Sequence, residues 1–425
     1  MSNKLKHLGS TGHEVPTEAL FQVFEYAKAK SLFYQRLFEN LTLEENEFSL
    51  KNFKKLPFTN KEDVSKSNLD FLAVSKDKVA DYSTTSGTSG DPITVFLSKA
   101  DLENLAKNEA DSFKLAGATS QDVFQLMTTM DKQFMAGLAY YLGAQRLNAG
   151  MIRLGPGLPA YQWKSIFLYN PTILIGVPSF IVSLLDFAKN QGIEFSKSSV
   201  RKIICIGEAI REDDFSLNVL GKRITQEWNV ELFSTYASTE MGVAFTECRV
   251  HNGNHLNSDL LYLEVINEFG EDAKDGCVGE IVITTLKREA MPLLRYRTGD
   301  LARVYREPCK CGNTAARIGR IIGRKNQMIK FKGTTIFPAA IFEIFDSLPN
   351  NWLYKVEVSK DYLDNDKITI YLQEEMEETS DFDRVLDKCK SNLKVVPFFV
   401  FEKIDVLSRM IFNKDFRKPE KIVFK

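Results

Sequence analysis

Between about residues 120 and 240, short apolar segments alternate with amphipathic segments, and no other feature of the chain constrains its fold as strongly. The apolar segments have the length and composition of buried strands. They lie at residues 122–129, 172–178, 201–208 and 230–238. The segments between them, at 136–148, 179–192 and 211–228, have the spacing of helices. Because strands joined through helices pair in parallel, this pattern predicts an α/β fold with a parallel βαβ sheet.

The rest of the chain has a different pattern. Short strands at 261–267 and 279–286 predict a small antiparallel subdomain, and a hairpin is predicted between residues 355 and 373. A chain of 425 residues is too long for one typical core. We therefore expect a large N-terminal domain, residues 1–325, and a small mobile C-terminal α+β domain, residues 326–425.

The charge of the chain argues against several classes of partner. Its 55 Lys and Arg residues nearly balance its 56 Asp and Glu residues, which is not typical of proteins that bind nucleic acid or an anionic membrane. The most apolar stretch, residues 165–185, is interrupted by Asn170, Pro171, Gly176 and Pro178, so we expect no membrane-spanning helix. No apolar leader opens the chain, and we expect it in the cytoplasm.

Five short motifs carry polar residues suited to binding a nucleotide, although each alone has an ordinary structural explanation. A Ser-, Thr- and Gly-rich loop at 83–92 either wraps a phosphate with its backbone N–H groups or is a flexible turn. Glu240 follows a predicted strand at the edge where parallel sheets bind ligands, and Asp300 closes a Tyr-Arg-Thr-Gly-Asp motif. Arg324 and Lys414 lie in basic segments that would otherwise be a linker and an ordinary surface.

The order of these motifs resembles the adenylate-forming superfamily, which contains acyl-CoA synthetases, peptide-synthetase adenylation domains and luciferases. Within this group, the segments LPFTNKEDV (56–64) and EPCKCGNTAARIGRIIGR (307–324) are similar to those of phenylacetate–CoA ligases. The resemblance covers most of the chain. It implies that the protein uses ATP, Mg²⁺ and coenzyme A, and that its substrate is a small-molecule carboxylic acid.

The resemblance also implies a role for each motif. The residues that would hold the β- and γ-phosphates of ATP are Ser86, Gly87, Thr88, Ser89 and Gly90. Those that would line the adenine pocket are Glu208, Ala209, Ser234, Thr235 and Tyr236. Thr239 would contact the α-phosphate and Glu240 would hold Mg²⁺. Asp300 would bind the ribose hydroxyls with help from Arg324. Lys414 would bridge the substrate carboxylate and the α-phosphate, where two anions meet.

By the same resemblance, the protein joins an aromatic or apolar carboxylic acid to CoA through an acyl-adenylate. The small domain would rotate about Asn326 between the two steps, which also keeps water from the adenylate. The residues that would line the acid pocket are Phe134, Tyr140, Tyr141 and Pro178. These four residues are equally plausible as ordinary core.

Two alternatives to a CoA ligase stay open. The first is the same adenylation with the phosphopantetheine of a carrier protein as the acceptor. The second is a non-catalytic nucleotide or metabolite binder, because Asn413 replaces the Gly that usually precedes the family's lysine. A homodimer is also left open by the sequence.

Four residues predict a structural metal site. Cys248 and His255 have six residues between them, and Cys309 and Cys311 form a Cys-x-Cys pair. Three thiolates and one imidazole are a ligand set for tetrahedral Zn²⁺, and phenylacetate–CoA ligase-like proteins are similar at these positions. His251 is a rival ligand, and the alternative is a set of free cysteines beside a surface histidine. A nucleic-acid-binding zinc module is disfavoured, because the chain lacks the ligand spacing of a zinc finger.

Overall fold

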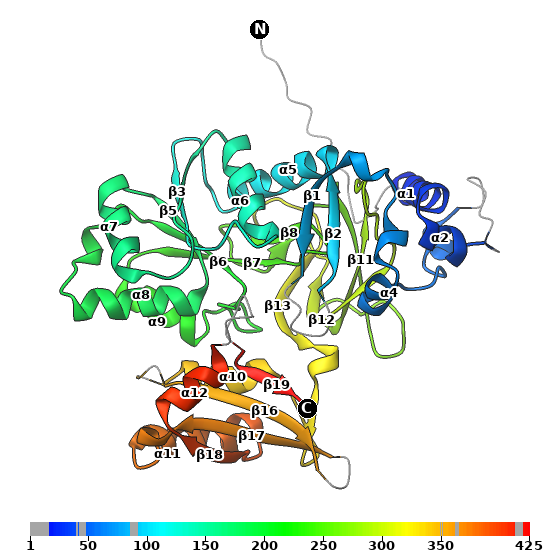
Figure 1. Cartoon of the computed structure of the whole chain (residues 1–425). Helices are drawn as coiled ribbons and strands as arrows, with labels where there is room; N and C mark the ends of the chain where they lie inside the picture. Colours follow the sequence, from blue (N-terminus) through cyan, green and yellow to red (C-terminus); the bar gives the residue numbers. More distant parts are fainter. Residues whose placement is uncertain are drawn as a thin grey trace.

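The fold is known from a computed structural model, which describes most of the chain. The described residues are 17–39, 41, 48–85, 92–348, 350, 352–361, 365–412 and 420–425. An eleven-stranded mixed sheet dominates the structure, with smaller sheets beside it (Figure 1). The predicted α/β fold class is confirmed.

Five strands of the large sheet pair in parallel. They are β3 (Val123–Leu126), β4 (Gly150–Arg153), β5 (Ile173–Gly176), β6 (Lys202–Ile206) and β7 (Glu231–Ala237). The alternating pattern predicts four of them, and β4 is an additional strand that the sequence analysis missed. Their spatial order is β7-β6-β5-β3-β4. Strand β3 lies between β5 and β4, so the chain reverses direction across the sheet at this point.

Helices cover both faces of these parallel strands. On one face, α5 (Lys99–Leu115) and α6 (Met135–Arg146) pack against apolar side chains of β3, β5 and β6. The opposite face is covered by α7 (Pro159–Tyr169), α8 (Pro178–Asn190) and α9 (Val219–Glu227). Strands β5 and β6 contribute apolar residues to the cores on both faces, which explains why they read as continuous apolar runs.

The helix predicted at 211–228 is shorter than expected, and the prediction was wrong for residues 211–218. Helix α9 begins at Val219, because the side chain of Asn218 accepts a hydrogen bond from the Gly221 backbone N–H and caps the helix. Phe215 has a φ of 67°, which a right-handed helix excludes. Residues 211–218 therefore form an irregular loop, in which Arg211 and Leu217 form an isolated bridge.

Antiparallel strands extend the same large sheet beyond β7. They are β8 (Ala244–Glu247), β9 (Asn254–His255), β10 (Leu261–Ile266), β11 (Val278–Thr285), β12 (Tyr296–Tyr305) and β13 (Arg317–Arg324). The predicted antiparallel strands are thus joined to the parallel ones through β8 and β9. This continuity matters for function, because it fixes β12 and β13 relative to the end of β7.

The N-terminal elements pack against the antiparallel half of the sheet. They are α1 (Thr17–Lys30), α2 (Leu32–Leu37), α3 (Leu50–Phe53), α4 (Lys61–Lys66) and the hairpin of β1 (Val79–Thr84) with β2 (Thr94–Ser98). Their aromatic side chains join one core with apolar residues of β10 and β11. Among the described residues, no helix has the length and apolar character needed to cross a membrane.

The C-terminal unit, residues 329–425, has a hydrophobic core of its own. It contains a hairpin of β14 (Ile329–Phe331) and β15 (Thr334–Ile336), and a four-stranded sheet in the order β18-β17-β16-β19. The strands are β16 (Tyr354–Lys360), β17 (Asp366–Gln373), β18 (Phe398–Glu402) and β19 (Ile422–Phe424). The helices are α10 (Pro338–Asp346), α11 (Ser380–Lys388) and α12 (Ile404–Ile411). Strands β16 and β17 form the hairpin that the sequence predicts. The unit follows β13 and lies beside the large sheet (Figure 1).

Candidate functional site

The large sheet brings together three predicted site residues that are far apart in the sequence. The Tyr236 hydroxyl donates a hydrogen bond of 2.7 Å to Asp300 Oδ2, and Arg324 Nε donates one of 3.1 Å to Asp300 Oδ1. Strand pairing explains the second contact, because Asp300 of β12 and Arg324 of β13 are register partners. Burial, and then the charge of Asp300, raises the pKa of Tyr236 well above its ordinary value, so its hydroxyl remains a donor. We call these three residues the Asp300 cluster.

Glu240 and Thr239 lie in the turn that follows β7. The Tyr296 hydroxyl is 3.5 Å from Glu240 Oε1, at the outer limit of a hydrogen bond. Burial, and then the charge of Glu240, raises the pKa of Tyr296 far above its ordinary value. Sequence reasoning gave Tyr296 no role, although it is the first residue of the motif that ends in Asp300. Both ends of that motif therefore contact predicted site residues.

Glu208 is held at the start of a helix. It follows β6, and its carboxylate accepts hydrogen bonds from the backbone N–H and the hydroxyl of Ser179, at 2.9 Å and 2.8 Å. Ser179 is the second residue of α8, where the helix dipole and free N–H groups favour a negative charge. The sequence analysis missed Ser179. The available signal was the Pro-Ser pair that begins the helix.

The other predicted adenine-pocket residues lie around the same strand ends. Ser234 and Thr235 belong to β7, where the Ser234 N–H donates to Glu247 Oε2 and the Thr235 hydroxyl lies 3.4 Å from that of Thr246. The carbonyl of Ala209 accepts a hydrogen bond from the side chain of Asn218. These contacts fix the backbone of both segments.

Two predicted elements lie outside the described residues. They are the phosphate loop, Ser86 to Gly90, and Lys414. Next to the loop, Thr84 pairs with Thr94 in the β1–β2 hairpin, and the Thr85 N–H donates to the Ile93 carbonyl. The roles given to the loop and to Lys414 remain predictions.

The four residues predicted for the acid pocket belong to two helices, and two of them lie at the helix starts. Phe134 caps α6, Tyr140 and Tyr141 lie within it, and Pro178 is the first residue of α8. Tyr140 is buried in the core between α5, α6 and the sheet. The guanidinium of Arg153 lies 5.3 Å from the centre of the Tyr141 ring. Tyr140 thus has a packing role, and lining of an acid pocket by these residues remains a prediction.

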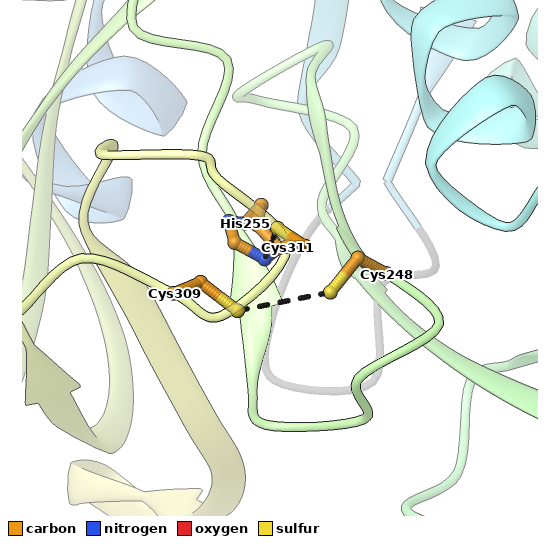
Figure 2. A group of neighbouring side chains, drawn as sticks. All are labelled: Cys248, His255, Cys309 and Cys311. Atoms are coloured by element: carbon orange, nitrogen blue, oxygen red, sulfur yellow. Dashed lines mark hydrogen bonds between the residues drawn. The ribbon is translucent and has the colours of Figure 1, made fainter.

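The four predicted metal ligands converge on one point (Figure 2). Cys248 and Cys309 Sγ lie 3.8 Å apart, and Cys311 Sγ lies 3.6 Å from His255 Nε2. One potential ligand atom from each residue lies within 4.8 Å of all the others. Burial, and then the charge of Arg317, lowers the pKa of His255 to about 4, so its imidazole is neutral at pH 7. We call these residues the thiol cluster.

The ring of the rival ligand, His251, does not belong to the thiol cluster, although its backbone N–H donates to the carbonyl of Cys248. Its Nδ1 is 3.4 Å from Glu247 Oε2, and its Nε2 is 3.2 Å from Glu231 Oε1. Both ring nitrogens therefore face carboxylates. Of the two histidines that the sequence offers, the structure places His255 beside the thiols.

Comparison with known proteins identifies the family. Residues 12–286, which are more than half of the chain, match the family described as AMP-binding enzyme. The chain belongs to the AMP-binding enzyme family. The predicted membership in the adenylate-forming superfamily is confirmed. The prediction that the protein is an enzyme is confirmed by the same match, because the family is one of enzymes.

The curated relatives of this AMP-binding enzyme include phenylacetate–coenzyme A ligases. The protein from Thermus thermophilus is 29% identical over 339 residues, which cover 78% of this chain and 74% of the relative. The protein from Escherichia coli is 28% identical over 369 residues, which cover 84% of this chain and 82% of the relative. The resemblance to phenylacetate–CoA ligases that the motifs indicate is thus confirmed.

Among solved structures, 2-hydroxyisobutyryl-CoA ligase has the same fold at 20% identity. In its postadenylation state, bound to 2-HIB-AMP, its TM-score with this chain is 0.81, with 96% of this chain and 88% of that chain covered. In its thioesterification state, bound to 2-HIB-AMP and CoA, the TM-score is 0.69 with the same coverage.

Proposed function

We propose that this AMP-binding enzyme is an ATP-dependent carboxylic acid:CoA ligase that works through an acyl-adenylate. The observation that carries the proposal is the Asp300 cluster, which holds a carboxylate between Tyr236 and Arg324. Curated relatives named phenylacetate–coenzyme A ligase cover most of the chain and support the same reaction. The predicted division into domains at residues 325 and 326 is part of this proposal.

The Asp300 cluster is suited to bind the two hydroxyl groups of a ribose. An ionised carboxylate offers about four lone-pair positions on two oxygens. Tyr236 and Arg324 each use one of the two oxygens of Asp300 and thereby fix its orientation. A position remains on each oxygen for a ribose hydroxyl. Because the protein donors already fix the carboxylate, little ordering is needed when the nucleotide binds.

The proposed reaction has two steps. In the first, an oxygen of the acid's carboxylate attacks the α-phosphorus of ATP, a P–O bond forms, and the bond to the β-phosphate oxygen breaks to release pyrophosphate. In the second, the CoA sulfur attacks the acyl carbon and AMP leaves with the bridging oxygen. The protein must offset repulsion between anions in the first step. Thr239 and Lys414 are the residues that we assign to the α-phosphate.

Mg²⁺ fits the chemistry of one side chain in this region. Glu240 is an oxygen ligand of the kind Mg²⁺ prefers, and it follows the end of β7. Its one polar contact from a described side chain is the long one from Tyr296, so an oxygen remains for a cation. When bound, Mg²⁺ would neutralise phosphate charge.

The substrate is proposed to be an aromatic or apolar acid. The support is the name of the relatives and the apolar character of Phe134 and Pro178 at the starts of α6 and α8. A carrier-protein acceptor, a homodimer and a cytoplasmic location remain predictions from the sequence.

A structural Zn²⁺ fits the geometry of the thiol cluster. With Zn–S bonds of about 2.3 Å and a Zn–N bond of about 2.05 Å, tetrahedral geometry places two sulfurs about 3.8 Å apart and a sulfur about 3.6 Å from the nitrogen. The Cys248–Cys309 and Cys311–His255 distances are 3.8 Å and 3.6 Å, and the four ligand atoms all lie within 4.8 Å of one another. His255 Nδ1 is buried and has no hydrogen-bond partner among the described residues, so no second contact orients the ring. The ion would join β8, β9 and the 309–311 loop, and it would take no part in the reaction.

Product analysis tests the proposed function. Purified protein is incubated with ATP, Mg²⁺, CoA and one acid at a time from a panel of aryl and alkyl acids. We expect AMP and acyl-CoA in equal amounts with at least one apolar acid. If the acyl group is loaded onto a carrier protein and free CoA does not react, CoA is wrong as the proposed acceptor. Release of ADP in place of AMP would contradict the proposed adenylation.

A further inference from the structure

Arg320 connects the large sheet to the C-terminal unit. It lies in β13, a few residues before the predicted hinge at Asn326. Its Nε donates a hydrogen bond of 2.8 Å to Asp213, in the loop between β6 and α9. Its Nη1 donates one of 2.7 Å to Glu343, which lies in α10 of the C-terminal unit. One guanidinium thus binds carboxylates from both sides of the hinge.

A close backbone contact places α10 against β13. The aromatic ring of Phe337, the residue before α10, lies against Gly323 of β13, where an added Cβ would come within 2.6 Å of a ring carbon. Helix α10 also contacts α9 of the large sheet region. Figure 1 shows α10 on the side of the C-terminal unit that faces the large sheet. Rotation of the unit about the hinge would have to separate Glu343 from Arg320.

The contact contains repulsion as well as attraction. Glu212 lies beside Asp213, and its carboxylate is 3.6 Å from Arg320 Nη1. Burial, and then the negative charge of Glu343, raises the pKa of Glu212, while Arg320 opposes this shift. Three carboxylates therefore share one guanidinium, and Arg303 shares Asp213 as well. When Glu343 leaves, Arg320 keeps Asp213 and Glu212 loses a repulsive neighbour, so the contact can open at low cost.

The chain as a whole superposes better on one state of a related ligase than on another. The TM-score is 0.81 with 2-hydroxyisobutyryl-CoA ligase in its postadenylation state and 0.69 with the same ligase in its thioesterification state. We propose that Arg320 and Glu343 form a reversible latch that favours the orientation in which the acid is adenylated. This inference rests on the proposed function. Both residues act as positioning residues.

The latch is tested without substrate by single-molecule energy transfer in the full-length protein. Dyes are attached at exposed Lys164 of α7 and at exposed Lys390 of the C-terminal unit, through site-specifically incorporated residues. In Glu343→Gln, we expect the population with the orientation of this structure to fall by about two- to fivefold, as for a half-exposed ion pair. The control is Glu357→Gln, because Glu357 pairs with Lys425 inside the C-terminal unit. It should leave the distribution unchanged.

Kinetics separate the latch from a general structural effect. In Glu343→Gln we expect slower acid-dependent ATP–pyrophosphate exchange, with no loss in thioester formation from added acyl-adenylate. Identical energy-transfer distributions for the wild type and Glu343→Gln would overturn the latch, whatever the activity. A shifted distribution in a protein that adenylates no acid would keep the latch as a conformational contact and overturn the proposed function.

Discussion

The Asp300 cluster lies on strands of the large sheet, whereas His255 is the one member of the thiol cluster that lies on a strand, and the two clusters differ in what holds their polar atoms in place. In the Asp300 cluster, each carboxylate oxygen accepts a hydrogen bond from the protein. In the thiol cluster, one ligand atom from each of three thiols and an imidazole lies within 4.8 Å of the others, and these groups contact one another.

This difference indicates how far the Asp300 cluster depends on nucleotide and the thiol cluster on a metal. The Asp300 cluster is held in place by the protein, so we expect it to persist without nucleotide and to contribute to binding alone. The thiol cluster brings three thiols and an imidazole nitrogen to one point, so binding of a metal there would be coupled to folding. We therefore expect loss of stability from changes in the thiol cluster and loss of activity from changes in the Asp300 cluster.

The largest effect is expected from Cys309→Ser. Loss of a thiolate ligand should remove zinc and lower the free energy of unfolding by about 4 kcal/mol, in the range seen when a structural metal is lost. Elemental analysis and thermal melting measure the two effects. Cys277→Ser is the matched control, since Cys277 is exposed and lies outside the cluster. Absence of zinc from the purified wild-type protein would contradict the expectation that the stability of the thiol cluster depends on a metal.

The next effect is expected from Asp300→Ala. It removes the acceptor of two ribose hydroxyls, and charge-assisted hydrogen bonds of about 1.5–3 kcal/mol each predict a fall in kcat/KM for ATP of about 100-fold or more. The melting temperature should change far less than in Cys309→Ser. Asp259→Asn, at an exposed position, is the control. A large loss of stability with normal kcat/KM would reverse the assignment of the two clusters.

A smaller effect is expected from Tyr236→Phe. This change removes one of the two hydrogen bonds that orient Asp300, and a single bond of about 1 kcal/mol predicts a fall in kcat/KM for ATP of about fivefold. The effect should appear mainly in KM for ATP, because the carboxylate itself remains. Steady-state kinetics at varied ATP concentration measure it. No change in KM would show that Arg324 alone fixes the carboxylate.

The smallest effect is expected from His251→Gln. Both ring nitrogens of His251 face carboxylates, so the zinc content should stay at the wild-type value and the stability should change by about 1 kcal/mol or less. Elemental analysis of this variant beside His255→Gln decides between the two histidines. Loss of zinc in His251→Gln with retention in His255→Gln would exclude the cluster as drawn in Figure 2.

The sequence predicted the α/β fold because buried parallel strands leave a strong local signal. The resemblance assigned Asp300 and Arg324 to the same ribose, a role that stays a prediction, and strand register in β12 and β13 places the two residues side by side. It could not predict that residues 211–218 are irregular, because the cap at Asn218 and the positive φ of Phe215 depend on the loop's own backbone. Ser179 and Tyr296 were missed because their contacts join segments whose spacing carries no pattern.

The central claim is that the Asp300 cluster serves acid activation by ATP, and acid-dependent ATP–pyrophosphate exchange tests it most directly. With a panel of aryl and alkyl acids and no CoA present, we predict exchange with at least one apolar acid in the wild type. We predict that this exchange falls by about 100-fold in Asp300→Ala and is retained in Asp259→Asn. Absence of exchange with every acid, or equal exchange in Asp300→Ala and the wild type, would contradict the account.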